Sequence, residues 1–121
     1  MGFVTAIKSC FRQYVGFGGR APRSEYWYFF LFHVVVLFVL AIVDSLLFGM
    51  AAGLAPLSTL FVLGMILPSL AVGIRRLHDI DRTGWWVLLW FVPIVGIIVL
   101  LVFFVQRGTS GANRFGADPL A

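Results

Sequence analysis

Long apolar segments alternate with short charged ones along the chain. Lys, Arg, Asp and Glu are absent from residues 26–43, 45–74 and 85–105. Eighteen helical residues extend about 27 Å at ~1.5 Å per residue, which is close to the ~30 Å hydrocarbon core of a bilayer. The pattern therefore predicts an all-α integral membrane protein with three transmembrane helices.

The apolar run at residues 45–74 is too long for one helix in a compact bundle. Gly49, Gly53 and Pro56 disfavour helix and predict a turn within the run. Pro93 predicts a kink in the last apolar run. The predicted spans are residues 26–47, 57–74 and 85–105.

The two ends of the chain differ from the spans. Apolar side chains recur every three or four positions near the N-terminus, at Phe3, Ile7, Cys10, Tyr14 and Phe17. Lys8 and Arg12 fall on the other side, so residues 1–17 are expected to form an amphipathic helix. This helix either lies in the membrane interface or packs against the loops of its own bundle. Residues 106–121 lack apolar periodicity and are expected to be an irregular tail.

Composition supports one membrane domain over residues 1–121. The chain is 61% apolar and 12% charged, whereas soluble domains are nearer 45–50% apolar and 25% charged. So small a soluble globule has too little interior to hide this much apolar surface. The single cysteine, Cys10, excludes an internal disulfide.

The nine Lys and Arg residues give a net charge of +4. Because they lie in short segments beside apolar runs, we interpret them as topology signals and expect no nucleic-acid partner. Four precede the first span, three lie between the second and third spans, and two lie in the tail. With three spans, the N-terminus is predicted to be cytoplasmic and the tail external, in a multi-pass protein of the bacterial inner (plasma) membrane.

The connector at residues 75–86 holds the densest group of charges. One interpretation is structural, with helix-face ion pairs, a helix cap and Trp residues at the interface. The other is a site for a phosphate or an anionic lipid headgroup, since guanidinium groups bind phosphate through two hydrogen bonds. The residues of this second interpretation are Arg75, Arg76, His78 and Arg82, with Arg20 and Arg23 on the same predicted side.

Catalytic and metal-binding patterns are weak. His33 is the only other histidine and lies inside the first predicted span, so no histidine or cysteine pair has the spacing of metal ligands. His33 is expected to be neutral and hydrogen-bonded, or alternatively part of a proton relay. We expect no enzyme activity, no metal and no cofactor.

Three short blocks resemble the domain-of-unknown-function family 805, whose members are small bacterial inner-membrane proteins. They comprise residues 17–27, residues 68–79 running into Thr83-Gly84-Trp85-Trp86, and a tail block with Gly108-Thr109, Gly111, Asn113-Arg114-Phe115-Gly116 and Asp118-Pro119. The resemblance implies a membrane class and location and supplies no catalytic residues. It does single out Arg20, Arg23, Glu25, Arg75, Arg76, His78 and Asp79.

These residues also suggest a specific ion-pair network. We expect Glu25 to pair with Arg75 or Arg76, and Asp79 to pair with Arg20 or Arg23. Such a network would be partly desolvated, so that loss of one partner costs more than loss of a surface pair.

The leading functional hypothesis is a non-enzymatic structural or regulatory membrane subunit. Its expected partners are membrane lipids, particularly anionic ones, and a membrane protein or further copies of the same chain. The alternative is a small transporter or channel component acting as an oligomer. His33, Asp44 and Ser69 facing one lumen would favour that alternative.

Overall fold

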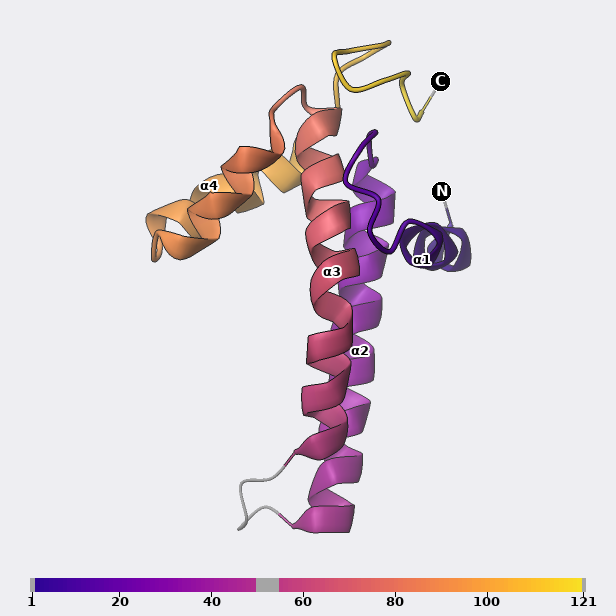
Figure 1. Ribbon diagram of the computed structural model, residues 1–121, viewed down its shortest axis with the longest axis vertical. Coiled ribbons are helices and arrows are strands. Elements are labelled where there is room, and N and C mark those ends of the chain that lie inside the picture. Colours follow the sequence, from indigo (N-terminus) through magenta and orange to yellow (C-terminus); the bar gives the residue numbers. More distant parts are fainter. Residues whose placement is uncertain (1, 50–54, 121) are drawn as a thin grey trace.

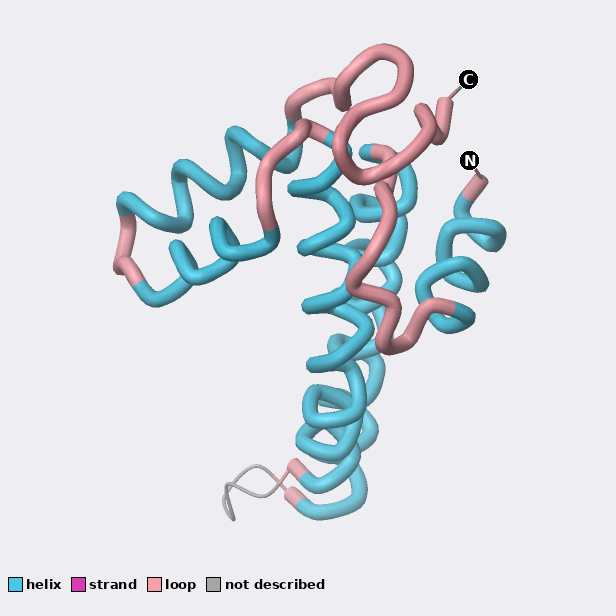
Figure 2. The backbone as a smooth tube through the Cα atoms, turned by 45° about the horizontal axis from the view of Figure 1, so that its top comes forward, coloured by secondary structure: helices cyan, strands magenta, loops and turns pink. Residues whose placement is uncertain are grey.

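The computed structural model describes residues 2–49 and 55–120. Within these residues it has four α-helices and one 3-10 helix: α1 (Phe3–Arg12), α2 (Arg23–Phe48), α3 (Pro56–Asp79), η1 (Gly84–Phe91) and α4 (Val95–Val105). Helices α2 and α3 lie side by side along the long axis of the molecule. The other elements gather around one end of this pair, the crowded end (Figures 1 and 2).

The α2–α3 pair is the candidate membrane-spanning part of the fold. Within the described residues these are the two helices long and apolar enough to cross a membrane, with 26 and 24 residues. Pro22 precedes α2 and Pro56 opens α3, where a proline suits the first turn because its missing N–H would have no helical partner. The two helices contain the predicted spans 26–47 and 57–74, and α3 continues through the first part of the connector to Asp79. Residues 50–54 of the predicted turn lie outside the described residues.

Asp44 holds the end of the pair that is remote from both termini. Its carboxylate accepts hydrogen bonds from the backbone N–H groups of Leu57 and Ser58, at 3.1 and 2.9 Å, and from the Ser58 hydroxyl at 2.8 Å. A carboxylate at this place satisfies helix N–H groups that would otherwise lack partners and stabilises the positive end of the helix dipole. A residue of α2 thus caps the N-terminus of α3.

The prediction of a single third span at residues 85–105 is wrong. The run instead forms a hairpin, in which η1 leads through a turn at Pro93 into α4, and Ile94 has a φ of +66°. Pro93 has no N–H to continue a helix, and a Cβ on Gly96 would overlap the Leu89 carbonyl oxygen. The arms extend only about 16 Å each, about half of a hydrocarbon core.

The hairpin also corrects the predicted position of the tail. Because the chain returns to the end from which it left, the tail packs against the C-terminal end of α3. The backbone N–H of Thr109 donates to the Asp79 carbonyl at 2.7 Å, and the Arg114 guanidinium pairs with Asp81. The tail therefore lies at the same end of the α2–α3 pair as the N-terminal segment (Figure 1), and not at the opposite end.

Helix α1 lies across the pair and is seen almost end-on in Figure 1. It ends at Arg12 and not at residue 17 as expected, and Ala6, Ser9 and Cys10 form its buried face. After α1, the Tyr14 hydroxyl donates to the Gly64 carbonyl of α3. The sequence left two environments open for this helix, the membrane interface and the bundle. The buried face of α1 packs on the bundle, while its other faces remain exposed.

Two apolar clusters join these elements. Cys10 and Ala21 pack with Phe29, Met65 and Val72, which attaches the N-terminal segment to α2 and α3. Leu77 packs with Leu100, Phe103 and Phe104, which attaches α4 to the end of α3. The second cluster lies at the crowded end, and the first extends toward the middle of the pair. Many other apolar side chains of α2 and α3 are exposed, as expected in lipid.

The hairpin makes a prediction about topology. Reporter proteins fused separately to the N-terminus and the C-terminus should both report the same side of the membrane, because among the described residues α2 and α3 are the two helices long and apolar enough to cross it. A paired assay with green fluorescent protein and alkaline phosphatase fusions measures this directly. Opposite readouts at the two ends would contradict the hairpin and restore three crossings.

Candidate functional site: a buried charge cluster

Five charged side chains from three parts of the chain meet at the crowded end. Arg20 comes from the segment before α2, Glu25 from the first turn of α2, and Arg75, Arg76 and Asp79 from the last turns of α3. Each of these side chains is 2% exposed or less. Charges so fully removed from water persist only when they are paired and hydrogen-bonded.

Glu25 joins three helices. Its carboxylate pairs with the Arg75 guanidinium at 2.6 Å and accepts a hydrogen bond from the Ser9 hydroxyl of α1 at 3.0 Å. The Cys10 thiol also donates to it, at 3.7 Å. The Nε and Nη2 atoms of Arg75 have no partner within the described residues. The carboxylate therefore attaches α1 to both α2 and α3.

Burial changes the chemistry of Cys10. Desolvation, together with the neighbouring Glu25 carboxylate, raises the pKa of the Cys10 thiol from an ordinary value of 9.0 to about 12. The thiolate is the nucleophilic form of cysteine, so the thiol is unreactive near neutral pH.

Asp79 bridges two arginines. Its Oδ1 atom accepts from Arg20 Nε at 3.0 Å, and its Oδ2 atom accepts from Arg76 Nη1 at 2.7 Å. The Arg20 pair links residues far apart in the chain, whereas the Arg76 pair connects successive turns of α3. A Cβ on Gly108 would overlap the Asp79 carboxylate, so only glycine lets the tail approach this bridge.

The other N–H groups of Arg20 and Arg76 bind backbone carbonyls. Arg76 donates from Nε to the Phe104 carbonyl at 3.1 Å and from Nη2 to the Gln106 carbonyl. Arg20 donates to the Thr109 and Gly111 carbonyls, at 2.6 and 2.7 Å. Carbonyls at a helix C-terminus lack helical partners, and a cation there is favourable for the dipole. A lysine has one compact ammonium group and would not reach these separate acceptors together.

His78 connects the N-terminal segment to the tail. Its Nδ1 atom lies 2.8 Å from the Gly19 carbonyl oxygen, which places the proton on Nδ1. Its ring stacks on Phe115, with centroids 3.9 Å apart and planes inclined by 2°. Asn113 Nδ2 donates to the His78 carbonyl at 2.9 Å. The histidine is thus held on both sides by neighbouring segments.

The other two predicted site residues lie at the edge of the cluster. The Arg82 guanidinium lies over the rings of Trp86 and Phe103, at 5.0 and 4.3 Å from their centroids. Arg23 is exposed and donates to the Val105 carbonyl at 3.3 Å. Both contacts anchor the hairpin to the rest of the chain, because Trp86, Phe103 and Val105 belong to η1 and α4.

The structure contains both expected kinds of pairing, Glu25 with Arg75 and Asp79 with Arg20, and adds Arg76 to the second. The contributions of Ser9 and Cys10 were not expected. Cys10 belongs to the predicted apolar stripe, but the sequence does not show that this stripe and Ser9 meet Glu25. The involvement of the tail was also missed, although its Gly-Thr and Asn-Arg-Phe-Gly groups were part of the family resemblance. Arg20 and Arg76 bind carboxylate and carbonyl groups, and Arg75 binds Glu25 through Nη1, so that the three arginines form a structural clamp.

Removal of the Glu25 charge should destabilise the protein strongly. Glu25→Gln leaves the buried Arg75 charge without its partner, which typically costs about 3–5 kcal/mol. Asp81→Asn is the matched control, because the Asp81–Arg114 pair is 42% and 59% exposed and such pairs contribute roughly 1 kcal/mol or less. Unfolding in mild detergent, followed by circular dichroism, measures both variants.

The double variant Glu25→Leu with Arg75→Met should recover much of that loss, because it removes both buried charges together. Equal stabilities of Glu25→Gln and Asp81→Asn would show that the buried pair does not hold the fold.

Cys10 should react very slowly with a maleimide in the native protein at pH 8. A pKa of about 12 in place of 9.0 lowers the thiolate fraction at that pH by about 1,000-fold. As the raised pKa belongs to the folded state, this thiol stabilises the fold below pH ~9, and that contribution is lost as the pH rises toward ~12. Mass spectrometry of native and detergent-denatured samples gives the two rates, and equal rates would contradict the buried, protonated thiol.

Comparison with known proteins agrees with this architecture. A family model described as "Protein of unknown function (DUF805)" matches residues 14–117. The chain is 51% identical over 111 residues to the inner membrane protein YhaI of Escherichia coli K12, covering 92% of each chain. It is 47% identical over 109 residues to the inner membrane protein YhaH of the same strain, covering 89% of this chain and 90% of YhaH. No solved structure matches it.

The matched region contains the whole α2–α3 pair, the hairpin, and all five residues of the buried charge cluster. The chain belongs to the DUF805 family and is a bacterial inner-membrane protein.

Proposed function

We propose that the protein is a non-enzymatic membrane subunit that binds anionic phospholipid headgroups at the cytoplasmic face of the inner membrane. Helix α1 is the element that makes this contact. The observation that supports the proposal most directly is the division of α1 into three faces, one attached to the bundle, one apolar and exposed, and one basic and exposed.

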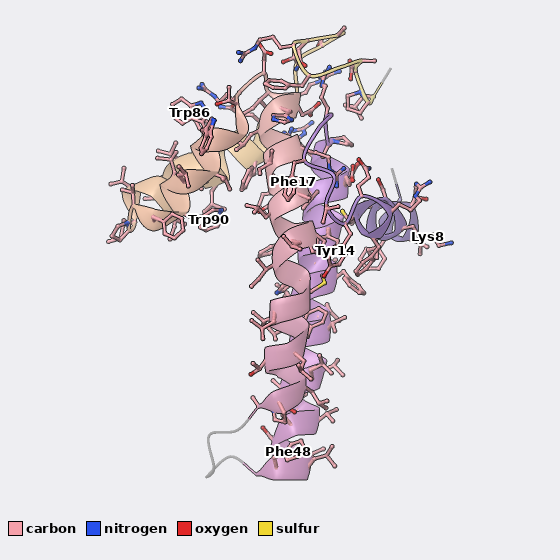
Figure 3. All side chains as sticks on the ribbon, viewed as in Figure 1. Lys8, Tyr14, Phe17, Phe48, Trp86 and Trp90 are labelled. Carbon is pink, nitrogen blue, oxygen red and sulfur yellow. The ribbon has the colours of Figure 1, made fainter. Side chains whose placement is uncertain are left out.

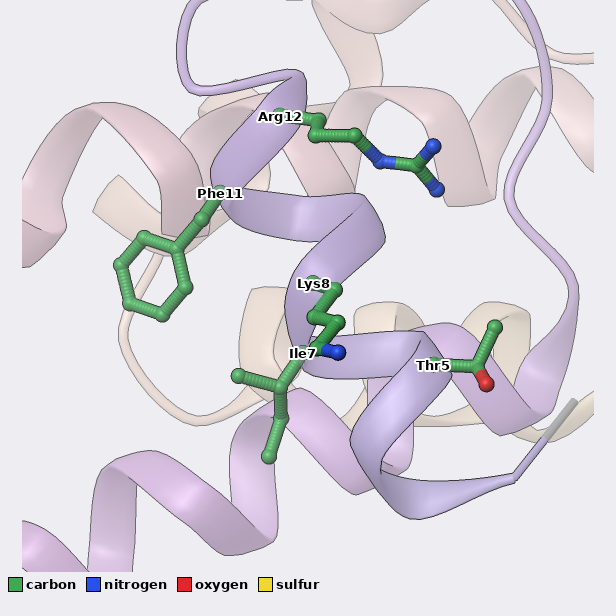
Figure 4. Close-up of a pocket in the computed structure, with 5 residues that line it drawn as sticks. All are labelled: Thr5, Ile7, Lys8, Phe11 and Arg12. Carbon is green, nitrogen blue, oxygen red and sulfur yellow. The ribbon is translucent and has the colours of Figure 1, made fainter.

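The attached face of α1 is the one that carries Ser9 and Cys10 against Glu25. The exposed apolar face includes Phe3, Val4 and Phe11. In the close-up of this helix, Ile7 and Phe11 project to one side, while Lys8 and Arg12 project from another part of its surface (Figure 4). A helix with this arrangement lies in the interface plane, with its apolar side in the acyl region and its cations among the headgroups.

Charge distribution supports the cytoplasmic orientation. All nine Lys and Arg residues belong to segments at the crowded end, and residues 45–74, which contain the opposite turn, have none. Basic residues near the ends of spans favour the cytoplasmic side. Two crossings with both termini in the cytoplasm therefore agree with the positive-inside rule better than three crossings do, because the two tail arginines no longer oppose it.

The buried charge cluster positions helix α1 and does not itself contact the headgroups. The side chains of Arg20, Arg75 and Arg76 are buried and pair with protein carboxylates. We therefore assign the headgroup contact to cations that are exposed. Lys8, Arg12 and Arg23 are exposed in the structure. The clamp fixes the positions of α1 and the tail relative to α2 and α3. The exposed cations are thereby held at one depth in the membrane.

The double variant Lys8→Gln with Arg12→Gln should reduce the enrichment of anionic phospholipid around the protein about twofold or more, because each basic residue near the surface contributes attraction. Extraction from native membranes into polymer nanodiscs, followed by lipid mass spectrometry, measures the enrichment. Lys8→Arg with Arg12→Lys is the control, since it preserves both charges and should match the wild type. An unchanged lipid composition in the glutamine variant would refute the proposal.

A second candidate, a transporter component, has one observation in its favour. His33 and Ser69 line a common cavity of about 220 Å³ within the membrane region, together with Tyr26 and Trp90. Asp44, however, caps α3 at the far end and does not line this cavity. A flux assay in proteoliposomes tests this candidate. Transport requires a solute or proton flux that His33→Leu abolishes. Absence of flux in the wild type would exclude transport by this chain alone.

A further inference from the structure

A groove between α3 and η1 is not explained by the contacts described so far. Its volume is about 590 Å³, within the range of sites that bind small molecules. Three of its lining residues, Leu70, Ile74 and His78, follow one another at intervals of four along α3. Such residues share one face of a helix and extend over about 12 Å. The groove is therefore elongated and runs along the spanning helix.

The opposite wall comes from the first arm of the hairpin. Trp85, Leu88 and Phe91 line it from η1, and Trp86 and Trp90 are labelled on the same arm in Figure 3. The side chains that line the groove are almost entirely apolar. Because the two walls belong to different elements, a hydrocarbon chain in the groove would contact protein on both sides, unlike a lipid that touches one face of a helix.

The polar end of the groove lies at the crowded end of the molecule. His78, Thr83 and Phe115 line it there. Since the Nδ1 atom of His78 faces Gly19, its Nε2 atom is the one left for a ligand. Arg82 and Arg114 adjoin these lining residues in the chain, and Asp81 pairs with Arg114.

The wider charge balance favours an anion at this end. It contains all nine basic residues and four of the five acidic ones, since Asp44 lies at the other end. The local field therefore attracts negative headgroups and disfavours an additional cation.

We propose that this groove binds one acyl chain of an anionic phospholipid, with its headgroup beside His78 and Thr83. The proposal rests on the proposed function for the class of ligand and adds a specific site for it. The occupant follows from three properties of the groove: its elongated apolar walls, its polar lining at the basic end, and its position beside a helix that is long and apolar enough to span the membrane.

Native mass spectrometry in mild detergent tests the site. The wild type, supplied with equal amounts of phosphatidylglycerol and phosphatidylcholine, should retain one phosphatidylglycerol molecule preferentially. Leu70→Trp fills the groove and should reduce this occupancy about tenfold. Leu63→Trp is the matched control, because it lies two turns away on nearly the same face of α3, is 60% exposed, and does not line the groove. It should retain the lipid as the wild type does.

Leu88→Trp fills the groove from the opposite wall and gives a second, independent variant if Leu70→Trp does not fold. Equal retention of the lipid by the wild type and a folded groove-filling variant would overturn the site. Equal retention of phosphatidylglycerol and phosphatidylcholine by the wild type would overturn its selectivity for anionic lipid.

The two lipid proposals fail separately. The Lys8→Gln and Arg12→Gln variant should lose enrichment in nanodiscs while it keeps the single lipid in detergent, and Leu70→Trp should do the reverse. If the wild type retains no lipid in detergent but the α1 variant still loses enrichment, the groove is refuted and the proposed function stands. If the single lipid remains and the α1 variant is unchanged, the groove stands and the role of α1 is refuted.

Discussion

The fold depends on the burial of Asp79 between two arginines. Arg76 precedes it by three residues on α3, whereas Arg20 reaches it from the segment before α2. A carboxylate in this position needs both partners, because an unpaired buried charge is far more costly than an unpaired neutral group. The requirement brings the start of α2, the end of α3 and the beginning of the tail to one place, and each of these segments leads to another part of the molecule.

The hairpin illustrates how far this constraint extends. Helix α4, the second arm of the hairpin, has only eleven residues. Without other partners, its last carbonyls would face an apolar environment. Arg76 donates to the carbonyls of Phe104 and Gln106, and Trp27 Nε1 donates to Phe104 as well, at 3.1 Å. Arg76, which pairs with Asp79, therefore also binds the last carbonyls of α4, the helix by which the chain returns to the crowded end. Ion pairing and backbone satisfaction are therefore one structural feature, and this accounts for arginine at position 76.

The basic residues divide into two groups with different physical roles. Those in the clamp are desolvated and paired with protein carboxylates, so they contribute structure and are not exposed to the membrane surface. Those on α1, together with Arg23, remain exposed and keep their charge available to the membrane surface. Helix α1 links the two groups, because its inner face contacts Glu25 while its outer faces carry Lys8 and Arg12. In this way a buried network determines where exposed charge is presented.

The sequence by itself determined the class of the protein, the positions of its two spanning helices and the identity of the charged cluster. These follow from local properties, since apolar content selects lipid as the solvent and isolated charges in such a chain must find one another. The pairing of Glu25 with an arginine of the connector was predictable for the same reason. Only the tertiary structure decided that residues 85–105 turn back at Pro93 and Gly96, because hydropathy measures the preference for lipid and does not measure the direction of the chain. It also decided that the tail joins Arg20 and Asp79, and that Asp44 caps α3, since both contacts connect segments whose sequences carry no sign of their neighbours.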